Sequence, residues 1–236
     1  MSKGTIYLIP TVLAPDTQTQ VLPDYTIQQV RNIEHFFVEN VRTARRFISS
    51  LKLGLNIENL TFYLIDKHTP AEEIKKNAQI LLKGKDVGII SEAGCPGIAD
   101  PGALVVNVGH KLGVRVVPLV GPSSIFLALM SSGLNGQSFA FKGYLPIDKQ
   151  DRIKAIKQLE KLSLSQQQTQ IFMETPFRNN QLLEVMRQQC RKSTKLCVAS
   201  NITAENAYIV TKTIQEWKNT EVDLHKKPTI FVLQAY

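Results

Sequence analysis

Residues 86–121 read DVGIISEAGCPGIADPGALVVNVGHKLGVRVVPLVG, and this stretch decides the fold. Its first four apolar residues, Val87 to Ile90, predict a short buried strand. The segment that follows, 91–97, contains two glycines and a proline, which rule out a regular element there. The stretch therefore begins as a strand that ends in a glycine-rich turn.

A helix and a second strand complete this unit. Asp100 is placed to cap the helix and Pro101 to occupy its first position, while Gly113 is placed to end it. Val114 to Leu119 then read as the next strand. A buried strand that ends in such a turn is where open α/β sheets bind ligands. The alternative for the turn is an ordinary strand-to-helix connection.

The same alternation of apolar strands and amphipathic helices runs through the 236 residues. It predicts an α/β protein with two domains, 1–119 and 120–236. We expect the second domain to have more strands, more antiparallel pairing and a mixed sheet. Strands are expected at 5–9, 33–38, 60–65, 139–144, 169–173, 196–199, 208–213 and 228–235, the last of them central. Helices are expected after Asn40 and over 69–82, 124–132, 148–162 and 179–186, with a surface loop at 16–23.

Composition describes a packed, basic protein. Apolar residues make up 43% of the chain, charged residues 20%, and the net charge is +8. Such a balance suggests a polyanionic partner, with plain solubility as the alternative. The three cysteines form no CxxC pair, no apolar run reaches the length of a membrane span, and no leader pattern opens the chain. We therefore expect a cytoplasmic protein without a membrane segment.

Two common nucleotide motifs are missing from the sequence. No glycine follows the strand at 5–9, as a dinucleotide fingerprint would require, and no GK[ST] of a P-loop occurs. The four histidines have no spacing typical of a metal site. Arg42, Arg45 and Arg46 share one face of a predicted helix; they form either a solvated basic face or a set of phosphate contacts.

Four segments together carry a family resemblance: GIISEAGCPGIADPG, VVPLVGPSS, FKGYLP and FMETPFR. In this order they resemble the class III S-adenosylmethionine-dependent methyltransferases, which have the tetrapyrrole methylase fold. Within that class the chain is most similar to the ribosomal RNA small subunit methyltransferase I family. The resemblance implies two α/β domains with the cofactor cleft between them, methylation of a ribose 2′-hydroxyl in 16S rRNA, and a homodimer.

The resemblance also implies which residues bind S-adenosylmethionine. The central turn is expected to run beside the cofactor, and the pair after the second strand to follow the hinge between domains. Met173 is expected near the adenine, and a later loop to close the pocket. The implied cofactor-binding residues are Pro10, Ala93, Gly94, Cys95, Ile98, Ser123, Ser124, Met173, Ile202 and Thr203, with Thr11 beside Pro10.

The chain departs from the family pattern on the substrate side. The first loop lacks the usual glycine and asparagine, the Glu-Asp-Thr-Arg run is Glu39-Asn40-Val41-Arg42, and Pro-His-Arg becomes Pro176-Phe177-Arg178. Glu92 stands where an aspartate is usual. The donor side is thus better preserved than the substrate side.

A ribose hydroxyl is a poor nucleophile, so a nearby base would help the transfer. Glu39, Glu92 and Glu174 are the catalytic candidates because each follows a predicted strand. The alternative for Glu174 is a structural ion pair with Arg178, four residues on. Beside a cleft, Arg42, Arg45, Arg46 and Arg178 become candidate substrate-binding residues for RNA phosphates.

Two other functions stay open on the sequence. One is methylation of a small molecule such as a tetrapyrrole. The other is an inactive relative that binds RNA, which the substrate-side departures favour and the intact donor-side turn opposes.

Overall fold

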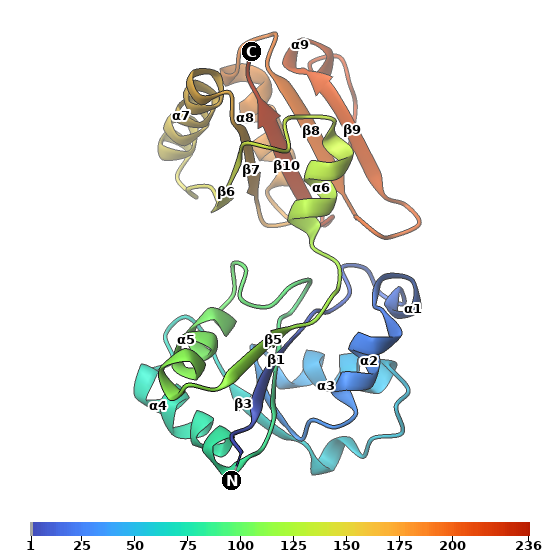
Figure 1. Cartoon of the computed structure of the whole chain (residues 1–236). Coiled ribbons are helices and arrows are strands. Elements are labelled where there is room, and N and C mark those ends of the chain that lie inside the picture. The colour runs from blue at the N-terminus through green and yellow to red at the C-terminus, as the bar shows by residue number, and fades with distance from the viewer. Residues whose placement is uncertain (1) are drawn as a thin grey trace. The chain divides into compact units, whose positions relative to one another are not determined.

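The computed structural model describes residues 2–236, which form two α/β units (Figure 1). One unit ends at Ser123, and the other runs from Ser124 to Tyr236. Each unit has its own five-stranded sheet. The α/β fold class expected from the sequence is confirmed.

The first unit is built on a parallel sheet with strand order β3-β2-β4-β1-β5. Helices cover both of its faces, as the crossover connections of a parallel sheet require. Its elements are β1 (Thr5–Ile9), α1 (Gln18–Val21), α2 (Asp24–Val30), β2 (His35–Val38), α3 (Val41–Ser50), the 3₁₀ helix η1 (Ile57–Asn59), β3 (Thr61–Leu64), α4 (Ala71–Asn77), the 3₁₀ helix η2 (Ala78–Lys83), β4 (Val87–Ile90), α5 (Gly102–Leu112) and β5 (Arg115–Pro118).

Side chains of successive strand residues point to opposite faces of the sheet and pack into two separate cores in this unit. Phe36 packs with α2 and α3 on one face, and its neighbour Phe37 packs with α4 and α5 on the other. Both rings are fully buried. This alternation follows from the period of two along a strand, and it fixes the register of the central strands.

Two local expectations for the first unit are wrong. Residues 16–23 contain the single-turn helix α1 and not only a loop, because Leu22 at its end is drawn into the core. The helix expected over 69–82 changes to 3₁₀ geometry at Ala78. Ala78 and Leu81 are both fully buried, and a spacing of three suits the tighter helix.

The second unit has a mixed sheet with strand order β6-β7-β10-β8-β9. Only β6 and β7 pair in parallel; the other three pairings are antiparallel. The excess of antiparallel pairing and the central place of β10 are confirmed, whereas the expected larger number of strands is wrong. Its elements are α6 (Ser124–Ser132), β6 (Phe139–Tyr144), α7 (Lys149–Gln166), β7 (Thr169–Met173), α8 (Asn179–Gln189), β8 (Lys195–Ser200), β9 (Tyr208–Thr213), α9 (Ile214–Trp217) and β10 (Thr229–Gln234).

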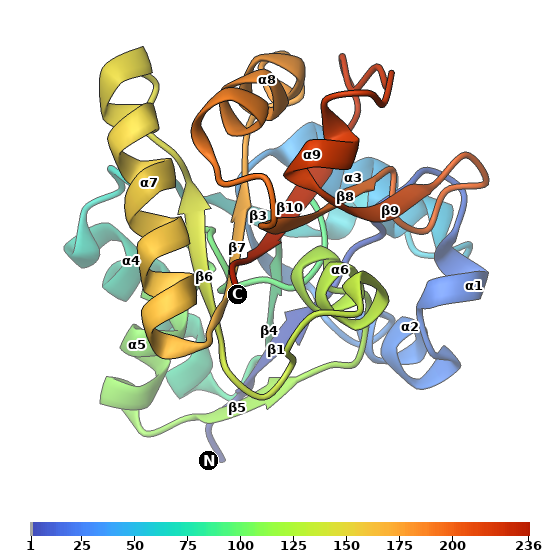
Figure 2. The same ribbon diagram turned by 90° about the horizontal axis from the view of Figure 1, so that it is seen from above.

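Helices also cover both faces of the second sheet. Figure 2 shows α7, α8 and α9 on one side of the strands and α6 on the other. The larger core lies under the three helices and contains Trp217, whose indole N–H donates to the Leu196 carbonyl at 2.8 Å. Each unit thus buries its own apolar surface.

Candidate functional site

In the first sheet, the connections that leave the adjacent parallel strands β1 and β4 cross opposite faces of the sheet. The chain passes from β1 to β2 across one face of the sheet and from β4 to β5 across the other, although β1 and β4 are adjacent. Ligands of open α/β sheets bind outside the carboxyl ends of strands at such a switch point. The segments that begin at Pro10 and Ser91 therefore form the candidate site.

The turn after β4 is held by a carboxylate at its centre. Asp100 accepts hydrogen bonds from the Gly97 amide at 2.9 Å and the Gly102 amide at 2.6 Å. The expected cap is shifted by one residue: α5 begins at Gly102 with Pro101 as its N-cap residue, and Asp100, one position earlier, ties the turn to the first amide of the helix. Gly94 and Ala99 both have positive φ, 73° and 61°, which an alanine tolerates poorly.

This turn is also bound to the loop after β1. The Thr11 amide donates to the Gly94 carbonyl at 2.9 Å, and the Ser91 hydroxyl donates to the same oxygen at 3.0 Å. Pro10 lies against Gly121, where an added Cβ would come within 2.4 Å of the proline Cβ. The two strand ends and the segment before Ser123 thus form one connected structure.

Several expected cofactor-binding residues meet here. Pro10, Gly94 and Cys95 lie together, with the Cys95 thiol donating to the Pro122 carbonyl at 3.5 Å. Ala93 and Ile98 lie exposed on the outer side of the turn, Ile98 with 53% of its surface accessible. This exposure of an isoleucine leaves room for a contact with a ligand.

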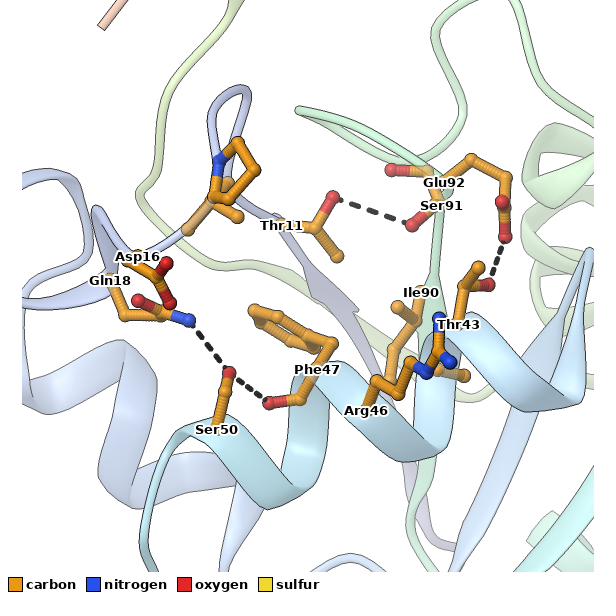
Figure 3. A pocket seen from close by; sticks show the side chains of 13 residues that line it. Thr11, Asp16, Gln18, Thr43, Arg46, Phe47, Ser50, Ile90, Ser91 and Glu92 are labelled. Carbon is orange, nitrogen blue, oxygen red and sulfur yellow. Dashed lines mark hydrogen bonds between the residues drawn. The ribbon is translucent and has the colours of Figure 1, made fainter. Parts of the chain in front are cut away.

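Three carboxylates gather beside the turn. The Glu92 amide donates to Glu39 at 3.4 Å, and the Thr43 hydroxyl donates to the Glu92 side chain (Figure 3). Burial raises the pKa of Glu39, and the nearby charges of Asp100 and Glu92 raise it further, against the opposing backbone hydrogen bond. Burial also raises the pKa of Asp100. A carboxylate with a raised pKa is a stronger base, which suits proton transfer near neutral pH.

The three arginines of α3 have different surroundings. The helix begins after Asn40, whose side chain accepts from the Arg42 amide at 2.9 Å. Arg42 is exposed on the first turn. The Arg45 guanidinium lies over the Phe62 ring, 5.5 Å from its centre. Arg46 lines a pocket that neither Arg42 nor Arg45 lines.

This pocket has a volume of about 480 Å³ and lies at the switch point. Apolar side chains, including Phe47 and Ile90, form its middle, and polar side chains stand at both ends. Figure 3 shows Asp16 and Gln18 at one end and Thr43 and Glu92 at the other. Thr11 belongs to its wall, so the pocket adjoins the glycine turn directly.

In the second unit, Glu174 forms a buried ion pair. Its carboxylate follows Met173 at the end of β7 and accepts from Arg178 at 2.6 Å and from the Thr175 amide at 2.6 Å. Burial alone would raise the pKa of Glu174, but these hydrogen bonds and the charge of Arg178 outweigh it and lower the pKa. The carboxylate is thus engaged as the partner of Arg178.

The loop after β8 holds two residues in a left-handed conformation. Asn201 has φ 51° and Thr203 has φ 74°, and the Thr203 hydroxyl is buried without a hydrogen-bond partner among the described residues. A β-branched residue at positive φ is strained, and such strain clusters at ligand sites. Ile202 between them is buried. Since β7 and β8 both run antiparallel to β10, Met173 and this loop lie at the same edge of the sheet.

The family model of the tetrapyrrole (corrin/porphyrin) methylases matches residues 12–218, most of the chain. The chain belongs to the tetrapyrrole methylase family. A solved structure of the methyltransferase CobJ has the same fold, with a TM-score of 0.63 at 13% identity, covering 99% of this chain and 94% of that one.

Two relatives of this methylase chain share a name. Proteins named ribosomal RNA small subunit methyltransferase I are 29% identical in Vibrio cholerae and 28% identical in Halalkalibacterium halodurans. The matches cover 84% and 78% of this chain but only 65% and 60% of those proteins. The methylase-family chain thus spans less than two thirds of the length of these two relatives.

The sequence gives little sign of part of this candidate site. It predicts only a capping role for Asp100, and it does not mark Gln18, Thr43 or Ser50 as pocket residues. The Ser123 and Ser124 pair divides between the two units, with Ser124 opening α6. Within residues 2–236 no group of three or more histidine, cysteine or acidic side chains could hold a metal ion. In the same residues no helix is both long and apolar enough to span a bilayer.

Proposed function

We propose that the chain is an S-adenosylmethionine-dependent methyltransferase that methylates a ribose 2′-hydroxyl of small-subunit rRNA. One observation carries the proposal: the Thr11–Gly94 hydrogen bond joins the glycine turn expected to hold the donor to the wall of a pocket with polar ends. The names of the relatives support the RNA substrate, as does the net charge of +8.

The residues present fit a bound nucleoside-like donor. In the first unit, the turn at Gly94 has positive φ and no side chain, and the exposed Ala93 and Ile98 lie on it together with Cys95, with Pro10 on the adjoining loop. Ser123 continues this set. In the second unit, the orphaned Thr203 hydroxyl supplies a buried polar atom with unused capacity, and we assign Ser124, Met173 and Ile202 to the same role. S-adenosylmethionine would supply a methyl group that its sulfonium already makes electrophilic.

We assign the proton transfer to Glu39. Its raised pKa and partly buried position suit a base, whereas Glu92 is exposed and accepts from Thr43. Glu92 positions Glu39 through its backbone amide. Glu174 is a weaker candidate because its ion pair with Arg178 lowers its pKa, which makes the carboxylate a weaker base and occupies one of its oxygens. Arg46 is the strongest candidate for a phosphate contact, followed by Arg42, Arg45 and Arg178.

The test measures transfer of a tritiated methyl group to 30S subunits and, in parallel, to uroporphyrinogen. We expect label in the rRNA, at a position where the phosphodiester bond resists alkali, because a 2′-O-methyl group removes the nucleophile of alkaline cleavage. Arg31→Gln is the control, since Arg31 precedes β2 and therefore lies at the amino-terminal end of the parallel strands, away from the candidate site at their carboxyl ends.

Three outcomes would overturn parts of the proposal. Label in uroporphyrinogen alone would assign a small-molecule substrate. Label in rRNA that leaves every bond alkali-labile would exclude the ribose. Absence of transfer, with no heat on titration of S-adenosylmethionine, would leave a protein that binds RNA without catalysis.

An rRNA substrate also implies a cytoplasmic location and is compatible with a dimer. Met130 on α6 has 77% of its surface accessible. An exposed apolar side chain of this size is common in contact surfaces. We propose a homodimer, which light scattering at micromolar concentration tests directly; a monomeric mass would contradict it.

A further inference from the structure

The pocket of the first unit has the chemical features of a nucleotide site, an inference that rests on the proposed function. Its volume of about 480 Å³ lies in the range of sites for small ligands. The middle is apolar, where Phe47 and Ile90 are both buried, and the two ends are polar (Figure 3). A nucleotide has a matching arrangement, because the apolar face of its base lies between the polar edge of the base and the polar sugar and phosphate.

A relay of hydrogen bonds fixes the side-chain amide at one end of the pocket. The Ser50 hydroxyl donates its only proton to the Phe47 carbonyl at 2.7 Å. It can therefore only accept from Gln18, whose Nε2 donates to it at 2.8 Å. Within the described residues the amide makes no other hydrogen bond, so its oxygen and one N–H remain available. A paired donor and acceptor of this kind is what recognises the edge of a nucleobase.

The other end of the pocket carries a guanidinium without a counter-ion. Among residues 2–236 no carboxylate forms an ion pair with Arg46. Arg45, one position earlier, is placed over Phe62 outside the pocket. A free guanidinium that lines a cavity is suited to a phosphate, which it can bind through two hydrogen bonds.

The wall between these ends adjoins the proposed donor turn. Thr11 lines the pocket, its hydroxyl donates to the Ser91 carbonyl at 3.4 Å, and its amide donates to Gly94. A sugar held between a base at Gln18 and a phosphate at Arg46 would therefore face the end of β4. That is the side from which a methyl group would arrive.

We propose that this pocket binds the nucleotide of the substrate RNA that is to be methylated, extruded from its strand. The base lies over Phe47 with its edge on Gln18, and the adjacent phosphate lies on Arg46. Extrusion is the general solution where an enzyme must reach a nucleotide inside a folded RNA, and stacking on an aromatic ring offsets the lost base stacking.

The test measures binding of a fluorescent single-stranded oligoribonucleotide, with nucleoside monophosphates as competitors. We expect Arg46→Gln to weaken RNA binding about tenfold, as a lost hydrogen bond to a charged group does, and to lower the salt slope by about 0.7. Gln18→Leu should weaken binding at unchanged salt slope, since it removes no charge. Arg31→Gln, which removes the same charge at the amino-terminal end of the strands, should leave the RNA affinity within about twofold of that of the unaltered protein.

Calorimetry with S-adenosylmethionine separates this proposal from the proposed function. Both pocket variants should bind S-adenosylmethionine as the unaltered protein does, which also shows that they fold. If they bind RNA and methylate 30S subunits normally, the pocket proposal is wrong while the enzyme assignment stands. If the monophosphates bind as tightly as the RNA does, the pocket serves a free nucleotide and the proposal is overturned.

Discussion

At the scale of single residues, Thr203 combines backbone strain with an unsatisfied buried hydroxyl. Its φ of 74° is unfavourable for a β-branched side chain, and its Oγ1 has no partner in the described part of the chain. Packing alone gives no reason to retain a threonine there. A ligand that accepts or donates a hydrogen bond at this oxygen would give one.

Thr203→Gly should therefore separate stability from binding. Removing the strain should raise the free energy of unfolding by up to about 1 kcal/mol, after the entropy that glycine adds to the unfolded chain. Affinity for S-adenosylmethionine should fall about tenfold with the lost hydroxyl. Urea unfolding and calorimetry measure the two quantities. Thr203→Ala is the control, since it loses the hydroxyl but keeps the strain; equal affinity in all three proteins would contradict the assignment.

The half-buried Glu39 and the buried Glu174 should respond to pH in opposite ways. The folded state raises the pKa of Glu39, so its contribution to stability is present at low pH and lost as pH rises through the folded value. Glu39→Gln should therefore be at least as stable as the unaltered protein at pH 7. Methyl transfer should drop about 100-fold, because the base is gone. Rate profiles and urea unfolding at pH 4 and pH 7 check both.

Glu174→Gln provides the contrast. The folded state lowers the pKa of Glu174, so its stabilisation is present above the unfolded pKa and disappears as pH falls. Breaking the pair with Arg178 should lower the free energy of unfolding at pH 7 by about 2 kcal/mol, less than for a fully buried pair because the arginine is partly exposed. Loss of transfer without loss of stability would instead make Glu174 catalytic.

At the scale of elements, the turn between β4 and α5 depends on one aspartate. Asp100 accepts from amides on both sides of the turn and thereby fixes the path of Gly97. Asp148 is the N-cap residue of α7, and its side chain accepts from the Gln150 and Asp151 amides. The two aspartates therefore form a natural pair for comparison.

Asp100→Ala should lower both stability and donor affinity. The lost hydrogen bonds to the Gly97 and Gly102 amides account for about 1–2 kcal/mol of unfolding free energy, and the released turn should weaken S-adenosylmethionine binding. Asp148→Ala should lower stability by a similar amount with no change in affinity. Calorimetry on both variants, below their unfolding temperatures, makes the comparison; parallel losses of affinity would show that the effect is only one of general stability.

Helices and strands could be predicted from the sequence where residues close together in the chain determine them. The strand at 87–90 and the stop at Gly113 were correct because apolar runs and glycine caps act over a few residues. The pocket could not be predicted, since Gln18, Thr43 and Glu92 come together only through the parallel order of the sheet. Asp100 was underestimated because a capping aspartate and a turn-fixing aspartate look alike in sequence.

At the scale of the whole molecule, the excess of basic residues is the property that an RNA partner would experience first. The net charge of +8 acts over a distance set by salt, about 8 Å at physiological ionic strength. Of the residues that the structure describes, Arg46 is the only basic one that lines the pocket, so most of the positive charge would act on the part of the RNA strand that lies outside the pocket.

RNA binding should therefore fall steeply as salt rises. Each phosphate neutralised on a single strand contributes about 0.7 to the slope of log affinity against log salt. Anisotropy titrations from low to high salt measure this slope, and S-adenosylmethionine affinity, measured over the same range, serves as the control. A flat RNA slope would exclude a nucleic-acid substrate held by charge.

The position of β10 has a consequence for how the chain is made. Among residues 2–236, β10 follows the other strands of its sheet in the sequence, yet it lies in the middle of the sheet and pairs with both β7 and β8. During synthesis, the edges of β7 and β8 stay unpaired until residues 229–234 have left the ribosome. A product truncated before Thr229 would lack the strand that joins the two halves of the sheet, and such a product should be degraded and not accumulate.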